Sequence, residues 1–159
     1  MSLQFFSVTL VARELPDFTI LVEKYSPAVV KIQVESHAAQ RIRNPAWRTG
    51  SEALQVGMGS GFIIESDGYI LTNHHVIDRA DKITVRLNDR QEFDAVVVGS
   101  DEPSDLALLK INAKNLPTLR LDTDDDLKVG AWVLAIGSPF GLDYSVSQGI
   151  VSAIGRSLP

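Results

Sequence analysis

Residues 59–77 read GSGFIIESDGYILTNHHVI, and this stretch predicts a β-hairpin followed by two adjacent histidines. Residues 62–66 and 69–72 form two runs of strand length, rich in apolar and β-branched side chains, on either side of Asp67 and Gly68. An Asp-Gly pair tolerates a positive φ angle and therefore closes tight hairpins. The stretch indicates antiparallel β-structure.

His74 and His75 follow this hairpin directly. Adjacent side chains of a strand point to opposite faces, so the pair could share one ligand only if the strand ends before them, which we expect. A zinc ion would need further ligands, and the sequence offers only His37 and scattered carboxylates, so no metal site is predicted. In a purely structural interpretation, one histidine packs and the other caps a turn.

Further strands are predicted on both sides of the hairpin. Residues 29–34 alternate between apolar and polar side chains, as a half-buried strand does. Many short strands, few helices and frequent turns indicate an all-β chain built as an antiparallel barrel or sandwich. The strands predicted downstream of the histidines are residues 83–87, 92–98, 106–111, 133–136 and 149–154.

A short amphipathic helix is predicted before the first strand. Apolar side chains recur from Phe18 at the spacing i, i+3, i+4 and i+7, Asp17 is a plausible N-cap, and Pro27 lies just past the end. Residues 36–56 show no period and predict a long loop that is either functional or disordered. The arginines of this loop, Arg41, Arg43 and Arg48, are interpreted as solvated side chains.

Composition limits the class of protein. The chain has 159 residues, 45% hydrophobic and 22% charged, enough for one domain or for one small barrel and part of a second. A net charge of −5 argues against nucleic-acid and anionic-membrane partners, and no apolar run approaches the roughly 20 residues of a membrane-spanning helix. The absence of cysteine excludes a disulfide scaffold and a cysteine nucleophile. The first 17 residues lack the basic region and cleavage pattern of a signal peptide.

Asp105 stands directly before the apolar run 106–111, where an unpaired carboxylate would be costly. We therefore expect it to pair with a buried imidazole whose Nδ1–H donates to the carboxylate, which fixes the histidine as a general base. Asp101 and Asp78 are the competing carboxylates. Asp78 follows His75 on what could be a helical turn, where a solvated or capping role is the simpler interpretation.

Three stretches in the same order resemble the HtrA/Deg family of chymotrypsin-like serine proteases: residues 59–77, then 83–111 (ITVRLNDRQEFDAVVVGSDEPSDLALLKI), then 129–156 (VGAWVLAIGSPFGLDYSVSQGIVSAIGR). The similarity runs from about residue 15 to residue 156 and is weakest over 36–56. It implies a chymotrypsin-like fold with a complete first barrel. The implied division is an N-terminal arm and helix at 1–27, the first β-barrel at 28–125, and the opening strands of a truncated second barrel at 126–159.

The resemblance also implies roles for two residues. The family's general base is the histidine before the valine of a TN-x-H-V motif, which corresponds to His75 and makes His74 its variable neighbour. The aspartate of the [ST]-D-[IL]-A-L motif orients that base and corresponds to Asp105.

The family's nucleophile has no counterpart in these residues, because it lies in a GNSGG motif beyond the stretch that matches residues 149–156. Ser60 precedes the histidine and lacks the glycine two positions away on either side that a nucleophile elbow has, so it is interpreted as part of a glycine-rich strand start. None of the serines after Asp105 lies in a Gly-x-Ser-Gly setting; they are Ser138, Ser145, Ser147, Ser152 and Ser157.

By this resemblance the whole enzyme would cleave peptide bonds in unfolded or misfolded proteins, without a cofactor, in the periplasm or cell envelope. It would form a homotrimer through the N-terminal arm and often carry a PDZ domain. The chain alone is predicted to be inactive. Two alternatives are a non-catalytic binding or assembly module, and a cut polypeptide whose serine-bearing half stays bound.

Overall fold

The computed structural model describes residues 16–38, 53–122, 127–138 and 145–155. Residues 1–15 of the predicted arm and helix at 1–27, and the arginines of the predicted loop, lie outside the described residues. Among the described residues, no helix is long and apolar enough to cross a membrane.

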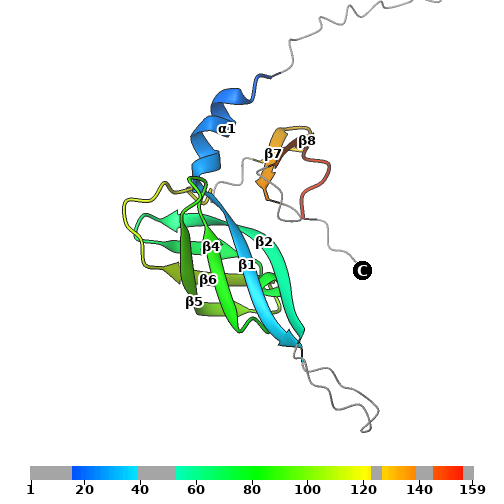
Figure 1. Cartoon of the computed structure of the whole chain (residues 1–159). Coiled ribbons are helices and arrows are strands. Elements are labelled where there is room, and N and C mark those ends of the chain that lie inside the picture. The colour runs from blue at the N-terminus through cyan, green and yellow to red at the C-terminus, as the bar shows by residue number, and fades with distance from the viewer. Residues whose placement is uncertain (1–15, 39–52, 123–126, 139–144, 156–159) are drawn as a thin grey trace, which may run out of the picture.

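Six antiparallel strands form a closed barrel in the order β1-β2-β3-β6-β5-β4 (Figure 1). This barrel, preceded by one short helix, confirms the predicted all-β architecture. The strands are β1 (Val29–Ala38), β2 (Ala53–Glu65), β3 (Tyr69–Thr72), β4 (Lys82–Arg86), β5 (Glu92–Asp101) and β6 (Leu106–Ile111).

The hydrophobic core fills the barrel interior. Alternate residues of β1 and β6 supply it, as the period of two predicts, and Ile32 and Leu109 are fully buried. Burying such side chains contributes about 1.5–3 kcal/mol each. The core residues are Val30, Ile32, Val34, Ile63, Ile70, Ile77, Ile83, Val85, Leu87, Ala107, Leu109 and Ile111.

The predicted hairpin between β2 and β3 is present, and Gly68 in its turn has a φ of 106°. A Cβ atom there would lie 2.5 Å from the Ile111 carbonyl oxygen, so only glycine fits. The strand ends at Thr72, as expected, and a single helical turn, α2 (His74–Ile77), follows. This turn sets both histidines at one end of the barrel.

The prediction of a loop over 36–56 is wrong at both ends. β1 continues to Ala38 and β2 begins at Ala53, and these two residues pair across the strands. Ser60 therefore lies inside a strand and does not start one. Alternate glycines hid the strand from a periodicity argument, because they carry no apolar side chain. They are required by close packing: a Cβ on Gly59 would lie 2.5 Å from Val76 Cγ1.

The predicted helix is α1 (Thr19–Tyr25), followed by the 3₁₀ turn η1 (Ser26–Ala28) that contains Pro27. Asp17 is not the N-cap. Phe18 holds that position, so the helix begins one residue later than predicted. The Asp17 side chain still contacts the helix start, because the Thr19 N–H donates to Asp17 Oδ1 over 2.9 Å.

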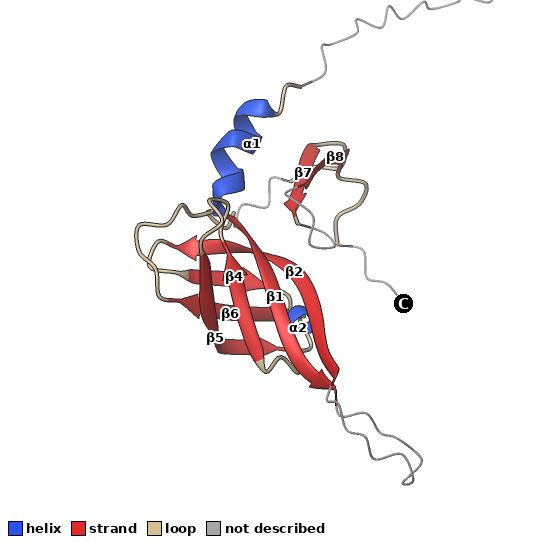
Figure 2. Ribbon diagram, viewed as in Figure 1, coloured by secondary structure: helices blue, strands red, loops and turns tan. Residues whose placement is uncertain are grey.

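Two further strands, β7 (Trp132–Gly137) and β8 (Ser145–Ile150), form a separate antiparallel pair (Figure 2). The strand predicted at 149–154 is therefore misplaced. β8 ends at Ile150 because its partner β7 begins at Trp132, the residue that pairs with Ile150. In the described chain, the apolar residues after Val151 therefore have no neighbouring strand to pair with. The Ser138 N–H donates to Ser60 Oγ over 2.9 Å and ties this pair to the barrel.

Candidate active site

His75 and Asp105, the two predicted site residues, lie in direct contact. His75 Nδ1 is 2.7 Å from Asp105 Oδ2, and the His75 backbone N–H donates to Oδ1 over 2.9 Å. An ionised carboxylate can only accept hydrogen bonds, so Nδ1 carries the proton and Nε2 is left with its lone pair. The geometry is that of an oriented general base.

The pair is more exposed than the sequence analysis expected. The His75 side chain is 70% exposed and the Asp105 side chain 44%. The expectation of a buried imidazole is wrong, because Asp105 lies in the turn before β6 at the barrel end and points out of the core. Within the described residues, no side chain hydrogen-bonds His75 Nε2, so this atom is open to an incoming proton donor.

The backbone around Asp105 aims its carboxylate at α2. Asp105 has a φ of 54°, a left-handed conformation that aspartate tolerates better than most residues. Its N–H donates to the Glu102 carbonyl, and the turn is closed by the Ser104 N–H donating to Asp101 Oδ2 over 3.1 Å. The chain therefore reverses just before β6 and presents the carboxylate to His75.

The electrostatics favour an ionised Asp105. The hydrogen bond from the His75 backbone N–H, and next the one from its imidazole, lower the pKa of the Asp105 carboxyl below its ordinary value. The carboxylate thus stays charged at neutral pH and can accept a hydrogen bond from the His75 imidazole.

The competing carboxylates have other partners. Asp101 closes the turn before Asp105, and Asp78 lies 3.5 Å from Arg79 Nε on the surface. Among the described residues, neither carboxylate forms a hydrogen bond or ion pair with a histidine ring. No group of three or more His, Asp or Glu side chains suited to a metal ion occurs in the described ranges.

Sequence reasoning missed two residues near the site: Asn73, which contacts Asp105, and Ser100, which contacts His74. Asn73 donates from Nδ2 to the Asp105 carbonyl over 3.0 Å and reaches Oδ2 at 3.3 Å. His74 Nδ1 lies 2.5 Å from Ser100 Oγ at the end of β5. The asparagine of the TN-x-H-V motif was a usable signal, whereas nothing in the sequence points to Ser100.

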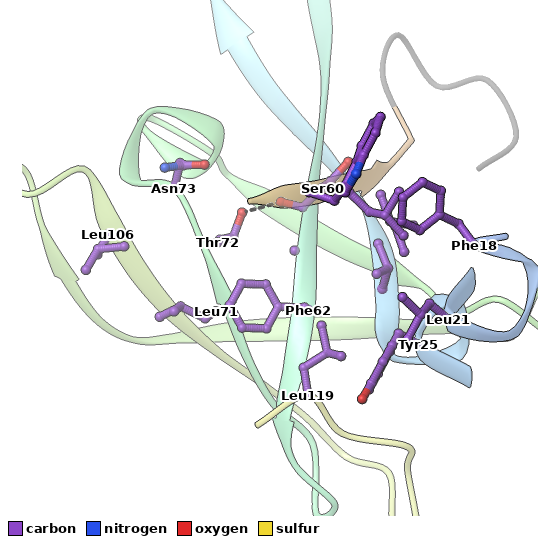
Figure 3. Close-up of a pocket in the computed structure, with 15 residues that line it drawn as sticks. Phe18, Leu21, Tyr25, Ser60, Phe62, Leu71, Thr72, Asn73, Leu106 and Leu119 are labelled. Atoms are coloured by element: carbon purple, nitrogen blue, oxygen red, sulfur yellow. Dashed lines mark hydrogen bonds between the residues drawn. The ribbon is translucent and has the colours of Figure 1, made fainter. Parts of the chain in front are cut away.

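A largely apolar groove of about 520 Å³ borders the site (Figure 3). It runs between α1, the outer face of β2 and β3, and β7, with Phe18, Phe62 and Leu71 in its walls. Asn73, which hydrogen-bonds Asp105, belongs to its lining. The aromatic rings of Phe18 and Trp132 meet across it at a centroid distance of 5.8 Å.

The chain is similar to known proteins over most of its length. Residues 59–158 match the model of the trypsin-like peptidase domain. The chain is 51% identical over 96% of its length to a probable periplasmic serine endoprotease, DegP-like, of Pseudomonas fluorescens, and 51% identical over 93% to the protein of the same name in a Marinomonas species. A solved structure, "HtrA-type protease AlgW with tripeptide", superimposes with a TM-score of 0.76 at 38% identity and covers 89% of this chain.

The matches cover a minor part of the relatives. The chain spans 38% of the Pseudomonas fluorescens protein, 37% of the Marinomonas protein and 42% of the AlgW chain. The similarity confirms the predicted chymotrypsin-like fold, and the first barrel is closed as expected.

Proposed function

Since this chain belongs to the HtrA family of trypsin-like serine proteases, we propose that it carries the general base and the orienting acid of a serine endopeptidase. In this proposal His75 is the base and Asp105 orients it. The observation that supports it best is the 2.7 Å contact between His75 Nδ1 and Asp105 Oδ2, reinforced by the His75 N–H.

The chemistry follows from the open Nε2 atom. His75 Nε2 accepts the proton of a serine hydroxyl as its oxygen bonds to the carbonyl carbon of a peptide, and the imidazolium is stabilised by Asp105. The same proton then passes to the amine that leaves as the C–N bond breaks. Water repeats the sequence to release the acyl group, so no cofactor is needed.

The serine and the oxyanion donors are proposed to lie outside these 159 residues, which contain no Gly-x-Ser-Gly sequence. In the same proposal, residues 28–125 form the first barrel. Residues 126–159, which include β7 and β8, form the opening strands of the second barrel. The relatives' names support a periplasmic protease. Unfolded or misfolded protein chains as substrates, and a homotrimer held by residues 1–27, follow from the family resemblance.

A second candidate is a non-catalytic assembly module. It is favoured by the apolar side chains that the β7–β8 pair exposes, among them Trp132, Val146 and Ile150. Exposed apolar surface of this kind marks an interface with another chain or segment.

A chimera separates the two candidates. Residues 1–159 are fused to the remainder of the Pseudomonas fluorescens relative, and casein hydrolysis and mass by light scattering are measured. His75→Ala should lower kcat/KM by about 10³ or more, and His74→Ala by less than about tenfold. Equal losses at the two histidines, or a folded chimera that is inactive, would contradict the catalytic proposal. If a chimera that lacks residues 1–14 has the same number of subunits by light scattering, the proposed role of the arm in holding the trimer is contradicted.

A further inference from the structure

The helical turn that carries His75 is short and little supported by its own hydrogen bonds. α2 has four residues, and its N-cap, Asn73, makes no side-chain bond to the turn. An exposed ion pair such as His75–Asp105 contributes only about 0–1 kcal/mol by itself. The orientation of the imidazole therefore depends on what holds the flanks of α2.

The inner flank is held by packing. Ile77 is buried in the core, and Val76 lies against Gly59 of β2, where even one added methyl group would clash. These contacts fix the depth of α2 on the barrel. They do not fix the side of α2 toward β5, where the half-buried His74 contacts Ser100.

The side of α2 toward β5 is held by a side-chain hydrogen bond. His74 Nδ1 lies 2.5 Å from Ser100 Oγ, and the His74 backbone N–H donates to the Asp105 carbonyl over 3.1 Å. A serine hydroxyl can donate to a neutral ring nitrogen or accept from a protonated one, so the contact survives either charge state of His74.

A β-bulge aims Ser100 at this position. Val97 pairs with Leu109 but Gly99 pairs with Leu108, so Val98 is an extra residue in β5. After the bulge Ser100 stands opposite Ala107, a buried residue. If the pairing of residues 95–97 continued through residue 98 without the bulge, Ser100 would stand opposite Leu106 and its side chain would leave on the other face.

We propose that Ser100 is a positioning residue, which acts through His74 to hold the His75 imidazole in line with Asp105. This inference rests on the proposed function, because it gives the bulge and the second histidine a role in orienting the base. Ser100 touches neither His75 nor any reacting atom and is not itself catalytic.

The test measures the tautomer of His75 in the ¹⁵N-labelled 159-residue chain. Long-range ¹H–¹⁵N NMR spectra distinguish the Nδ1–H form from the Nε2–H form at a pH where histidine is neutral, about 9. Ser100→Ala should lower the ratio of Nδ1–H to Nε2–H at His75 by up to about threefold to tenfold, since the free energy of one hydrogen bond is the most that its loss at His74 can pass on to His75. Ser100→Thr keeps the hydroxyl and should retain the wild-type ratio.

Ser66→Ala is the matched control, since Ser66 lies in the hairpin turn at the far end of the barrel and should leave the ratio unchanged. Melting temperatures of all variants are recorded. An unaltered ratio in Ser100→Ala, with or without a lower melting temperature, overturns the positioning role. Asp105→Asn separates this failure from that of the proposed function: if it too leaves the tautomer unchanged, the His75–Asp105 pair itself is refuted.

Discussion

At the scale of single residues, the contact between His75 and Asp105 was predictable because each residue carries a local signal. Asp105 stands in the S-D-L-A-L stretch and His75 in the T-N-H-H-V stretch, and the family resemblance identifies both. Ser100 carries no such signal. Its role depends on a bulge that shifts one strand by one residue, and single-sequence patterns do not show a shift of that size.

The lowered pKa of Asp105 predicts a specific pH dependence of stability. A carboxyl whose pKa is lower in the folded state stabilises the fold at pH values above its unfolded pKa, and this contribution is lost as the pH falls through the folded pKa. The unfolded value is near 3.8, so the contribution is full at neutral pH and disappears below that value. Asp105→Asn should therefore melt lower than wild type at neutral pH.

Thermal melts of both proteins from neutral pH down to about 2 check this prediction. The difference in melting temperature should shrink as Asp105 becomes protonated in the wild type. Asp78→Asn is the control, because Asp78 makes only a surface pair with Arg79. A difference for Asp105→Asn that stays constant with pH would show that the ionised carboxylate is not what stabilises the turn.

At the scale of elements, periodicity located the strands whose alternate side chains are apolar. It failed where glycines replace apolar side chains within a strand, and where the length of a strand is set by the neighbouring strand with which it pairs. β6 appears over the predicted residues 106–111 because every second residue enters the core. The prediction missed the first half of β2, because Gly57 and Gly59 carry no apolar side chain that would show a period of two. The apolar run 149–154 gave a signal, but only its beginning has a strand to pair with.

The packing of β2 against α2 predicts that Gly59→Ala is destabilising. The new Cβ would meet both methyl groups of Val76, at 2.5 and 2.7 Å, so α2 must shift outward. Overpacking of this kind costs about 1–3 kcal/mol. Urea unfolding should show that loss, and adding Val76→Ala should restore part of it.

Gly149→Ala in β8 is the matched control for the change at Gly59. A Cβ at Gly149 has no atom within 4 Å, and this glycine has no positive φ, so its stability should change little. Equal effects of the two alanines would mean that the close contact with Val76 is not what requires a glycine.

At the scale of the whole molecule, three parts meet around one groove. α1, the outer face of the barrel and β7 each contribute apolar side chains, and the bond from the Ser138 N–H to Ser60 Oγ joins the last two (Figure 3). Sequence patterns located the helix and most of the strands but did not reveal the groove, because the groove depends on contacts between segments more than 70 residues apart.

The arrangement of serines predicts that the 159-residue chain does not react with a fluorophosphonate probe. Such a probe labels only a serine whose hydroxyl is activated by a base about 3 Å away. In the described chain no serine hydroxyl hydrogen-bonds His75. The Ser100 hydroxyl bonds His74 instead, the Ser104 hydroxyl donates to Asp101 Oδ2, and the Ser60 hydroxyl oxygen accepts from the Ser138 N–H.

Purified chain and the active chimera are treated with the probe side by side, and labelling is followed by mass spectrometry. The chimera should be labelled in its added segment, and the label should disappear when His75 is replaced by Ala, because the base then no longer accepts the hydroxyl proton. Label found on the 159-residue chain and abolished by His75→Ala would place the nucleophile within these residues. The proposal that the serine lies outside these 159 residues would then be wrong, because that serine and His75 would act together without an added segment.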